Sequence, residues 1–336
     1  MDRKPRLALT MGDPAGIGAE VIVKAFTDAR EDADLLVVGD AGVVREAAAD
    51  LDVDLSVRAV ADAADASYEL GTLDVLDCDN VDDHEWGALR EEFGVASLEY
   101  VERAIDLALA DTVDGIVTAP INKQATRMAG AEHAGHTGLL AERTGVENYS
   151  MMLVEDDLRV THVSTHVPLR EACDLVTTEN VRDTIRVTRD GLRDLGIVDP
   201  AIAVAGLNPH ASDGGLLGDE DEAEIAPAVE GATDEGIDAT GPESPDTVYV
   251  RAARGEFDCV VSMYHDEGHI PIKMLGFSSG GEVSGVNMTV GLPLVRTSVD
   301  HGTAFDIAGE GVASPKSMVD AVDVAATAVR NRATRG

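Results

Sequence analysis

Short apolar runs alternate with segments of helical periodicity through the first third of the chain. The runs cover residues 6–11, 34–40, 72–78 and 114–120, and a stretch with apolar residues every three or four positions follows most of them. This alternation predicts βαβ units, in which helices cover both faces of a mostly parallel sheet. The expected fold class is therefore α/β.

A second region begins near residue 126 and has a different order of elements. The pattern predicts a hairpin, a helix and two buried strands, at residues 149–164, 178–195, 201–208 and 258–265. Ser314 as N-cap and Pro315 at the first helical position predict a long final helix. We expect two subdomains, residues 1–125 with 300–336 and residues 126–299.

Charge narrows the class of partner. The 336 residues carry a formal net charge of -37, from 63 acidic and 26 basic residues, and only five of the basic ones are lysines. Such a surface repels nucleic acid and anionic membranes. Acidic residues spread over normal apolar periodicity favour a halophilic protein, since a Debye length of about 3 Å at 1 M salt screens self-repulsion. We expect the acidic stretch 218–224 to be a solvated helix start.

The cysteines and the N-terminus indicate the compartment. Cys78, Cys173 and Cys259 are odd in number and scattered, so neither a disulfide framework nor a cysteine zinc site is expected. The first apolar stretch is too short for a signal peptide, and every other apolar run is shorter than a membrane span. The sequence therefore predicts a soluble, cytoplasmic protein.

Three histidines stand in separate short motifs where apolar runs meet polar or turn residues. They are His166 in STHVPLR, His210 in GLNPHASDGG and His265 in MYHDEGH. Strand ends carry the chemistry of α/β proteins, and imidazole is a common ligand of divalent metals. A three-histidine site suits Zn²⁺ or Co²⁺ better than Mg²⁺, although a lone buried histidine is more often a core residue. His162 and His269 have weaker claims and are left out of the metal shell.

Other segments could hold an anion or a nucleotide. GDPAGIGAE at 12–20 is predicted to form a tight turn, with Asp13 facing a cleft. The alternative is a phosphate-binding loop, for which the sequence signal is weak. A rare lysine, Lys123, ends TAPINK, where the alternative is a surface lysine. The candidate anion ligands are His136, Thr137, Lys273, Asn287 and Arg296. The structural alternatives are a helix cap for Thr137 and an ion pair for Arg296. The turn-rich segment 300–309 could bind a nucleotide.

Taken together, eight motifs in order resemble the 4-hydroxythreonine-4-phosphate dehydrogenase family of pyridoxal phosphate biosynthesis. They are MGDPAGIG, TAPINK, GHTG, STHVPL, GLNPHA, MYHDEG, GVNMTVGLP and RTSVDHGTAFDIAG, and they span about residues 6–330. The resemblance implies a two-subdomain α/β/α protomer similar to isocitrate and isopropylmalate dehydrogenases. It also implies a homodimer with the active site at the subunit interface.

The same resemblance assigns roles to residues. His166, His210 and His265 would bind one divalent metal (Zn, Co or Mg), with His265 supplied by the partner subunit. Substrate would be bound by His136, Thr137, Lys273, Asn287 and Arg296. The segment HGTAFDIAG is similar to the adenosine-binding loop of the isocitrate dehydrogenase group, which makes the cofactor candidates His301, Gly302, Thr303, Ala304 and Asp306.

The implied reaction is the NAD-dependent oxidation and decarboxylation of 4-phosphohydroxy-L-threonine to 3-amino-2-oxopropyl phosphate and CO₂, with NADP as an open alternative. Lys123 and Asp266 are the candidate catalytic bases. The segment 277–285 is longer than the family pattern, and Glu267 and His269 stand where Gln and an apolar residue are typical. The substrate alternatives are therefore 4-phospho-D-threonate and 4-phospho-D-erythronate. A phosphate acyltransferase, or a protein that binds its metal only structurally, is the alternative from a different class.

Overall fold

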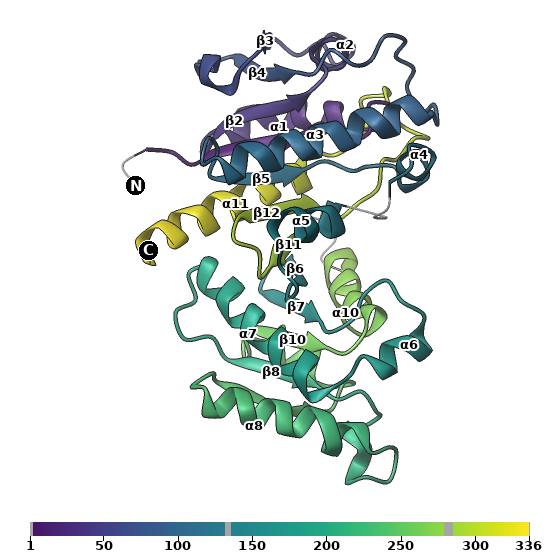
Figure 1. Cartoon of the computed structure of the whole chain (residues 1–336), viewed down its shortest axis with the longest axis vertical. Helices are drawn as coiled ribbons and strands as arrows, with labels where there is room; N and C mark the ends of the chain where they lie inside the picture. The colour runs from purple at the N-terminus through teal and green to yellow at the C-terminus, as the bar shows by residue number, and fades with distance from the viewer. Residues whose placement is uncertain (1–2, 132–135, 279–284, 336) are drawn as a thin grey trace. The chain divides into compact units, whose positions relative to one another are not determined.

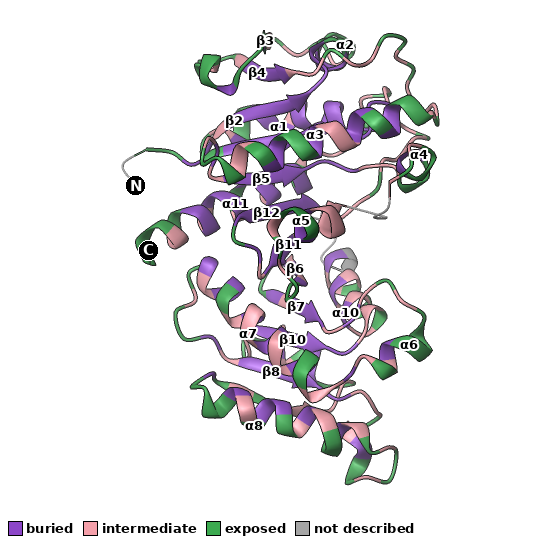
Figure 2. Ribbon diagram, viewed as in Figure 1, coloured by how far each residue is buried: buried purple, intermediate pink, exposed green. Residues whose placement is uncertain are grey.

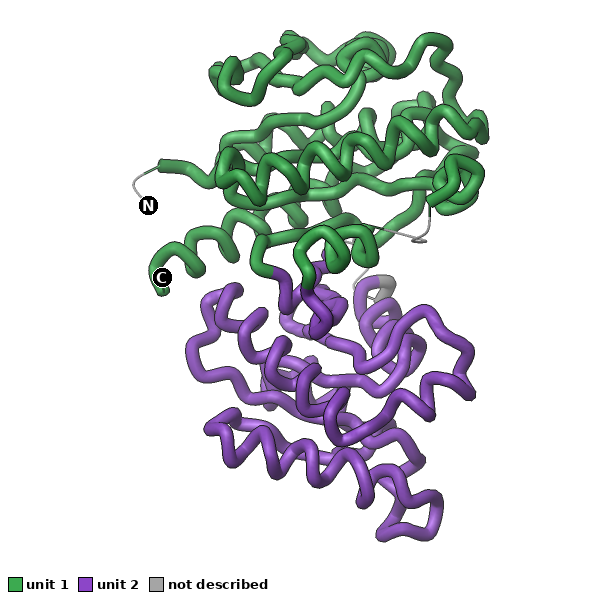
Figure 3. Tube along the Cα trace, viewed as in Figure 1, with its two compact units in different colours: residues 1–145, 293–336 green, residues 146–292 purple. Residues whose placement is uncertain are grey.

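The computed structural model describes residues 3–131, 136–278 and 285–335, and the chain divides into two compact units (Figure 3). Unit 1 contains residues 1–145 and 293–336, and unit 2 contains residues 146–292. The sequence predicts boundaries at 125/126 and 299/300, whereas the compact units divide at 145/146 and 292/293.

Unit 1 is built on six strands in the order β3-β4-β2-β1-β5-β12, and every neighbouring pair is parallel. Both faces of β1, β5 and β12 are covered, so nearly all of their residues are buried (Figure 2). The four apolar runs predicted as strands are confirmed. The strands are β1 (Arg6–Thr10), β2 (Asp34–Gly39), β3 (Ser56–Val60), β4 (Thr72–Asp77), β5 (Gly115–Thr118) and β12 (Val295–Val299).

The helices of unit 1 lie on both faces of these strands (Figure 1). The crossovers β1–α1–β2 and β4–α3–β5 run in opposite directions across the strand order, so right-handed connections put α1 and α3 on opposite faces. Helix α11 packs beside α1, and α5 packs against α3. The helices are α1 (Gly18–Ala29), α2 (Ala41–Asp50), α3 (Glu91–Leu109), α4 (Lys123–Met128), α5 (His136–Thr144) and α11 (Lys316–Arg335), with a 3₁₀ turn η1 (Ala63–Asp65).

Unit 2 contains six strands in the order β11-β6-β7-β10-β8-β9. The pairs β11/β6 and β6/β7 are antiparallel and the other pairs are parallel, so the sheet is mixed. The predicted hairpin is confirmed as β6 and β7, which turn at Asp156 in a left-handed conformation with φ 50°. The strands are β6 (Ser150–Glu155), β7 (Leu158–His162), β8 (Ile202–Ala205), β9 (Ala239–Glu243), β10 (Cys259–Ser262) and β11 (Val286–Val290).

The helices of unit 2 cover a core of apolar side chains from β6, β7, β8 and β10. Helix α7 begins where the sequence predicts it, because the Thr177 side chain caps the Asn180 N–H, and it ends before Gly196 at φ 92°. The helices are α6 (Leu169–Asp174), α7 (Thr178–Asp194), a π-helical turn η3 (Asp221–Ile225), α8 (Ala226–Asp234), α9 (Val248–Ala252) and α10 (His265–Ser278), with a 3₁₀ turn η2 (Ala211–Asp213). Among the described helices of the chain, none is long and apolar enough to cross a bilayer.

Candidate active site

In unit 1 the glycine-rich turn after β1 packs directly on the segment predicted to bind the cofactor. The Ile17 N–H donates to the Thr303 carbonyl at 3.0 Å. A Cβ placed on Gly16 would lie 3.0 Å from the Thr303 Cβ, so glycine permits this close approach. Two segments from opposite ends of the chain thus form one surface at the carboxyl end of β1, where α/β proteins bind ligands.

A third segment, residues 84–87, joins this surface, and little in the sequence pattern indicates this contact. The His84 ring places Nε2 3.0 Å from the Pro14 carbonyl and Nδ1 3.0 Å from Glu46 Oε2. The Gly87 N–H donates to the Ala15 carbonyl at 2.8 Å. Trp86, the single tryptophan, lies so close to Gly309 that a Cβ there would be 2.6 Å from its ring. An isolated His-Glu-Trp-Gly run is the only sequence signal for this contact.

The remaining cofactor candidates lie on a loop with unusual backbone. Ala304 has φ 44°, and its carbonyl accepts the Ile307 N–H at 3.1 Å. Gly302 and Asp306 are exposed, and the space around the missing Gly302 side chain is open. The His301 Nδ1 lies 3.0 Å from the Gly302 carbonyl. The loop therefore presents backbone and small side chains to solvent, as a nucleotide-binding loop must.

Four polar residues of unit 1 form a group that carries two positive charges: buried Arg296 and Thr118, half-buried His136 and exposed Lys123. Arg296 on β12 is 3% exposed, and its Nη2 donates to Oγ1 of buried Thr118 at 2.6 Å. Burial lowers the pKa of Arg296 to about 10. The pKa of His136 is lowered well below its usual value by burial, and further by the nearby positive charges of Arg296 and Lys123. Such a group attracts an anionic ligand.

Three members of this group are predicted from the sequence, and Thr118 is not. The Nε2 atom of His136 is buried and has no hydrogen-bond partner among the described residues, so it can accept or donate toward a ligand. Lys123 begins α4, where Asn122 caps the Gln124 and Ala125 N–H groups. Thr137, also predicted, follows His136 in the first turn of α5 and is half-buried.

Asp13 is a buried carboxylate beside the same turn. It is 1% exposed, its Oδ1 accepts the Ala15 N–H at 2.9 Å, and its Oδ2 has no hydrogen-bond partner in the described chain. Burial raises its pKa to about 6. Its N–H donates to the Pro120 carbonyl at 2.9 Å, which ties the turn to the end of β5.

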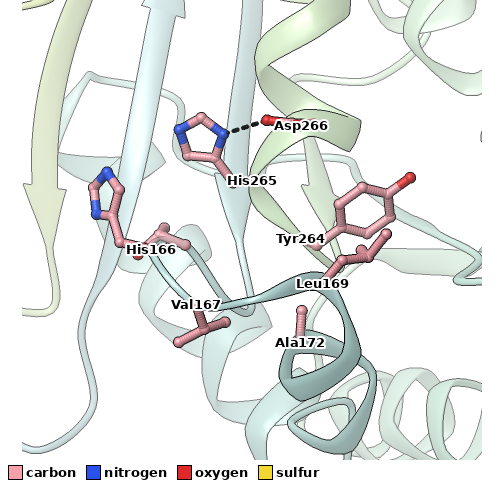
Figure 4. A pocket seen from close by; sticks show the side chains of 8 residues that line it. His166, Val167, Leu169, Ala172, Tyr264, His265 and Asp266 are labelled. Carbon is pink, nitrogen blue, oxygen red and sulfur yellow. Dashed lines mark hydrogen bonds and ion pairs between the residues drawn. The ribbon is translucent and has the colours of Figure 1, made fainter.

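In unit 2, His166 and His265 are neighbours with ring centroids 5.5 Å apart. Figure 4 shows both rings at the edge of a pocket whose other lining side chains include Val167, Leu169 and Tyr264. The His265 Nδ1 lies 2.7 Å from Asp266 Oδ1, drawn as the dashed line, so its Nε2 is left for a ligand. A carboxylate behind an imidazole is the usual support of a metal-binding histidine.

Two histidines that the sequence analysis left out extend this group. The His269 ring stacks on His265 with centroids 3.6 Å apart, and His162 lies 4.8 Å from His269. Burial, followed by the charge of His269, lowers the pKa of His162 to about 3, so His162 stays neutral. The i and i+4 spacing of His265 and His269 on one helix was the sequence signal that they would meet.

The third predicted metal ligand lies elsewhere in unit 2. His210 is exposed, and its Nδ1 is 3.9 Å from Asp246 Oδ2. Among the residues that the structure describes, there is no group of three His, Cys, Asp or Glu side chains that could hold a metal ion. The imidazoles of His166 and of His265, the latter held by Asp266, are suitable ligands for a divalent cation. One chain, however, brings together only two of the three predicted imidazoles.

Contrary to the prediction from the sequence, the acidic stretch 218–224 is not solvated along its whole length. Residues 221–225 do start a helix, but Asp221 is 1% exposed and not solvated. Its carboxylate accepts hydrogen bonds from the loop that carries His210, at Leu207, Asn208 and Ser212. Hydrophobic periodicity cannot reveal a buried carboxylate whose partners are backbone N–H groups and polar side chains, which is why the sequence pattern missed it.

The last two predicted substrate ligands are also in unit 2. Asn287 lies on β11, is half-buried, and has a buried Oδ1 with no hydrogen-bond partner among the described residues. Lys273 is half-buried on α10. Most of the long segment 277–285 between them, namely residues 279–284, lies outside the described residues.

Comparison with known proteins identifies the family. The family model described as pyridoxal phosphate biosynthetic protein PdxA matches residues 31–325. The 4-hydroxythreonine-4-phosphate dehydrogenase of Beijerinckia indica subsp. indica is 46% identical over 320 residues, which cover 95% of this chain and 94% of the relative. The D-threonate 4-phosphate dehydrogenase of Salmonella typhimurium is 44% identical over 323 residues, which cover 95% and 97%.

Solved structures agree with this result. The crystal structure of a 4-hydroxythreonine-4-phosphate dehydrogenase from Burkholderia phymatum aligns with a TM-score of 0.84 and 44% identity, over 97% of this chain and 99% of that one. The fold and the relatives define an α/β dehydrogenase, an oxidoreductase. The chain belongs to the PdxA family. The phosphate acyltransferase alternative is thereby set aside.

Proposed function

We propose that this protein is an NAD-dependent, metal-dependent dehydrogenase that oxidises and decarboxylates a four-carbon, 4-phosphorylated 3-hydroxy acid. The observation that carries the proposal is the group formed by the buried cation Arg296, the neutral His136 and the exposed cation Lys123. In a chain of net charge -37, a positive group at strand ends is a specific place for a phosphate or carboxylate. It lies in the same unit as the proposed nucleotide loop.

In this proposal, different residues of unit 1 bind the substrate, exchange a proton with it and bind NAD. Arg296 and Lys123 balance the charge of the anionic substrate, and Thr118 keeps the guanidinium in place. His136 stays neutral, so its Nε2 can share a proton with a substrate oxygen. The loop from His301 to Asp306 binds the adenosine part of NAD, and the turn at residues 12–17 supports that loop.

His166, His210 and His265 are the proposed metal ligands, with Asp266 orienting His265. When bound, the metal supplies Lewis-acid polarisation of the substrate oxygen during oxidation and decarboxylation. The family resemblance assigns His265 to the partner subunit, whereas His166 and His265 of one chain already lie side by side and His210 does not join them. We propose a homodimer that completes the site. Lys123 and Asp266 remain the candidate bases, and Lys273 and Asn287 further substrate ligands.

The first substrate candidate is 4-phosphohydroxy-L-threonine. The second is 4-phospho-D-threonate, which the name of the Salmonella typhimurium relative favours. The test is NADH formation, followed at 340 nm, from these two compounds and 4-phospho-D-erythronate, with and without a chelator. We expect turnover of one of them, lost on chelation and restored by Zn²⁺ or Co²⁺. Absence of NADH with all three, or activity indifferent to chelation, would contradict the proposal.

A further inference from the structure

The loop that carries His210 has a backbone that its own residues do not favour. His210, Ala211, Ser212 and Asp213 all have left-handed φ angles, of 56°, 53°, 63° and 45°. A single non-glycine residue in this region is uncommon, and four in succession are strained. Such a conformation persists only where surrounding contacts hold it.

One buried side chain supplies these contacts. Asp221 Oδ1 accepts the Leu207 N–H at 2.9 Å. Its Oδ2 accepts the Asn208 N–H at 3.2 Å, the Asn208 side-chain amide at 2.8 Å and the Ser212 hydroxyl at 2.5 Å. The carboxylate therefore binds both ends of the turn that contains His210.

The approach of Asp221 depends on a glycine. A Cβ on Gly206 would lie 2.4 Å from Asp221 Oδ1 and 2.9 Å from the Ala211 Cα, so any larger residue would push the carboxylate and the loop apart. Glu220 adds a second acceptor for the Asn208 amide at 2.9 Å. The acidic segment is thus an anchor for the His210 loop, in addition to being a helix start.

We propose that Asp221 is a positioning residue that holds His210 in the conformation needed to bind the divalent metal. Charge-assisted hydrogen bonds to a carboxylate are about twice as strong as neutral ones, which suits a strained loop. His210 itself is exposed, so packing does little to fix it. The inference rests on the proposed metal-binding role of His210.

The experiment titrates Co²⁺ into the metal-free protein and follows its visible absorption, which reports both affinity and coordination geometry. The variants are Asp221→Asn, His210→Ala and Asp219→Asn, the last an exposed aspartate in the same segment. We expect Asp221→Asn to keep the fold by circular dichroism, to bind Co²⁺ at least tenfold more weakly, and to give a changed spectrum. Asp219→Asn should behave as wild type.

The outcomes separate the two proposals. Loss of Co²⁺ binding in His210→Ala, with wild-type affinity and spectrum in Asp221→Asn, overturns the positioning role and leaves the proposed function intact. Wild-type Co²⁺ binding in His210→Ala overturns the metal assignment and this inference with it. If Asp221→Asn does not fold, Ser212→Ala removes one donor only, and we expect a severalfold loss of Co²⁺ affinity. An unchanged affinity in that variant overturns the inference.

Discussion

Arg296 and Thr118 are joined by a 2.6 Å hydrogen bond between two buried positions of unit 1, from Nη2 to Oγ1. The bond fixes the direction of a guanidinium whose charge, together with that of Lys123, lowers the pKa of His136. An arginine fixed in this way gives the substrate a charge and a geometry at once.

We therefore predict that Arg296→Ala raises KM for the phosphorylated substrate about 10- to 100-fold, the cost of a lost charge-assisted contact. Thr118→Val should raise KM by a smaller factor, since it removes only the support of the guanidinium. Steady-state kinetics measures both. The control is Arg103→Ala, which removes an exposed arginine paired with Glu99. Unaltered KM and kcat in Arg296→Ala would exclude Arg296 from the substrate site.

The position of the single tryptophan offers an assay for the cofactor loop. Trp86 lies against Gly309, close to the proposed adenosine-binding loop, so bound NADH should quench its emission by energy transfer. Gly16→Val should weaken NADH binding at least tenfold, because a side chain there meets Thr303 at about 3 Å. Ala110→Val, at an exposed site, is the control. Equal NADH affinity in Gly16→Val would show that this turn does not support the cofactor site.

Lys24 should contribute to the free energy of unfolding through a partly buried ion pair. Its Nζ donates to Glu20 Oε1 at 2.9 Å and to the Gly311 and Ala313 carbonyls at 2.6 and 2.7 Å. Lys24→Met leaves the Glu20 charge buried, so we expect a loss of about 2–3 kcal/mol in the free energy of unfolding. Lys316→Met breaks an exposed pair with Asp320 and should cost less than about 0.5 kcal/mol. Urea denaturation compares the two, and equal losses would contradict the argument.

Asp13 makes stability depend on pH. Its pKa rises from 3.8 to about 6 in the folded protein, so the folded state favours the protonated form and Asp13 destabilises the fold progressively between about pH 4 and pH 6. Asp13→Asn should be more stable than wild type by about 3 kcal/mol at pH 8, and the difference should vanish below about pH 4. Asp28→Asn, at an exposed site, controls for the lost charge. A stability difference that does not change with pH would be inconsistent with this account.

Salt should stabilise the protein. Self-repulsion at a net charge of -37 is screened at molar ionic strength, so the melting temperature should rise between dilute buffer and molar KCl. Differential scanning calorimetry measures it. A melting temperature that stays constant or falls would remove the argument for a halophilic protein.

Periodicity predicted much of the fold. The four apolar runs predicted as strands contain β1, β2, β4 and β5. The predicted acidic turn of the hairpin joins β6 to β7. The final helix begins at Lys316, one residue after the predicted start at Pro315, and the Lys316 N–H donates to the hydroxyl of the predicted cap Ser314 at 3.3 Å. Local rules suffice where one residue decides the start or end of an element.

The site was less predictable, because its contacts join distant segments. The approach of Ile17 to Thr303, and of His162 to His269, depends on the strand order, which periodicity does not reveal. The His210 loop was missed for a different reason. Its left-handed residues violate local preference, and only the buried Asp221 carboxylate explains them.

The most direct test of the central claim is the stoichiometry of the reaction. The protein, with Zn²⁺ or Co²⁺ and NAD, would be given carboxyl-labelled 4-phosphohydroxy-L-threonine or 4-phospho-D-threonate, and NADH and labelled CO₂ would be measured together. The account predicts one CO₂ for each NADH formed from one of the two substrates. NADH without CO₂, or neither product from both substrates, would contradict it.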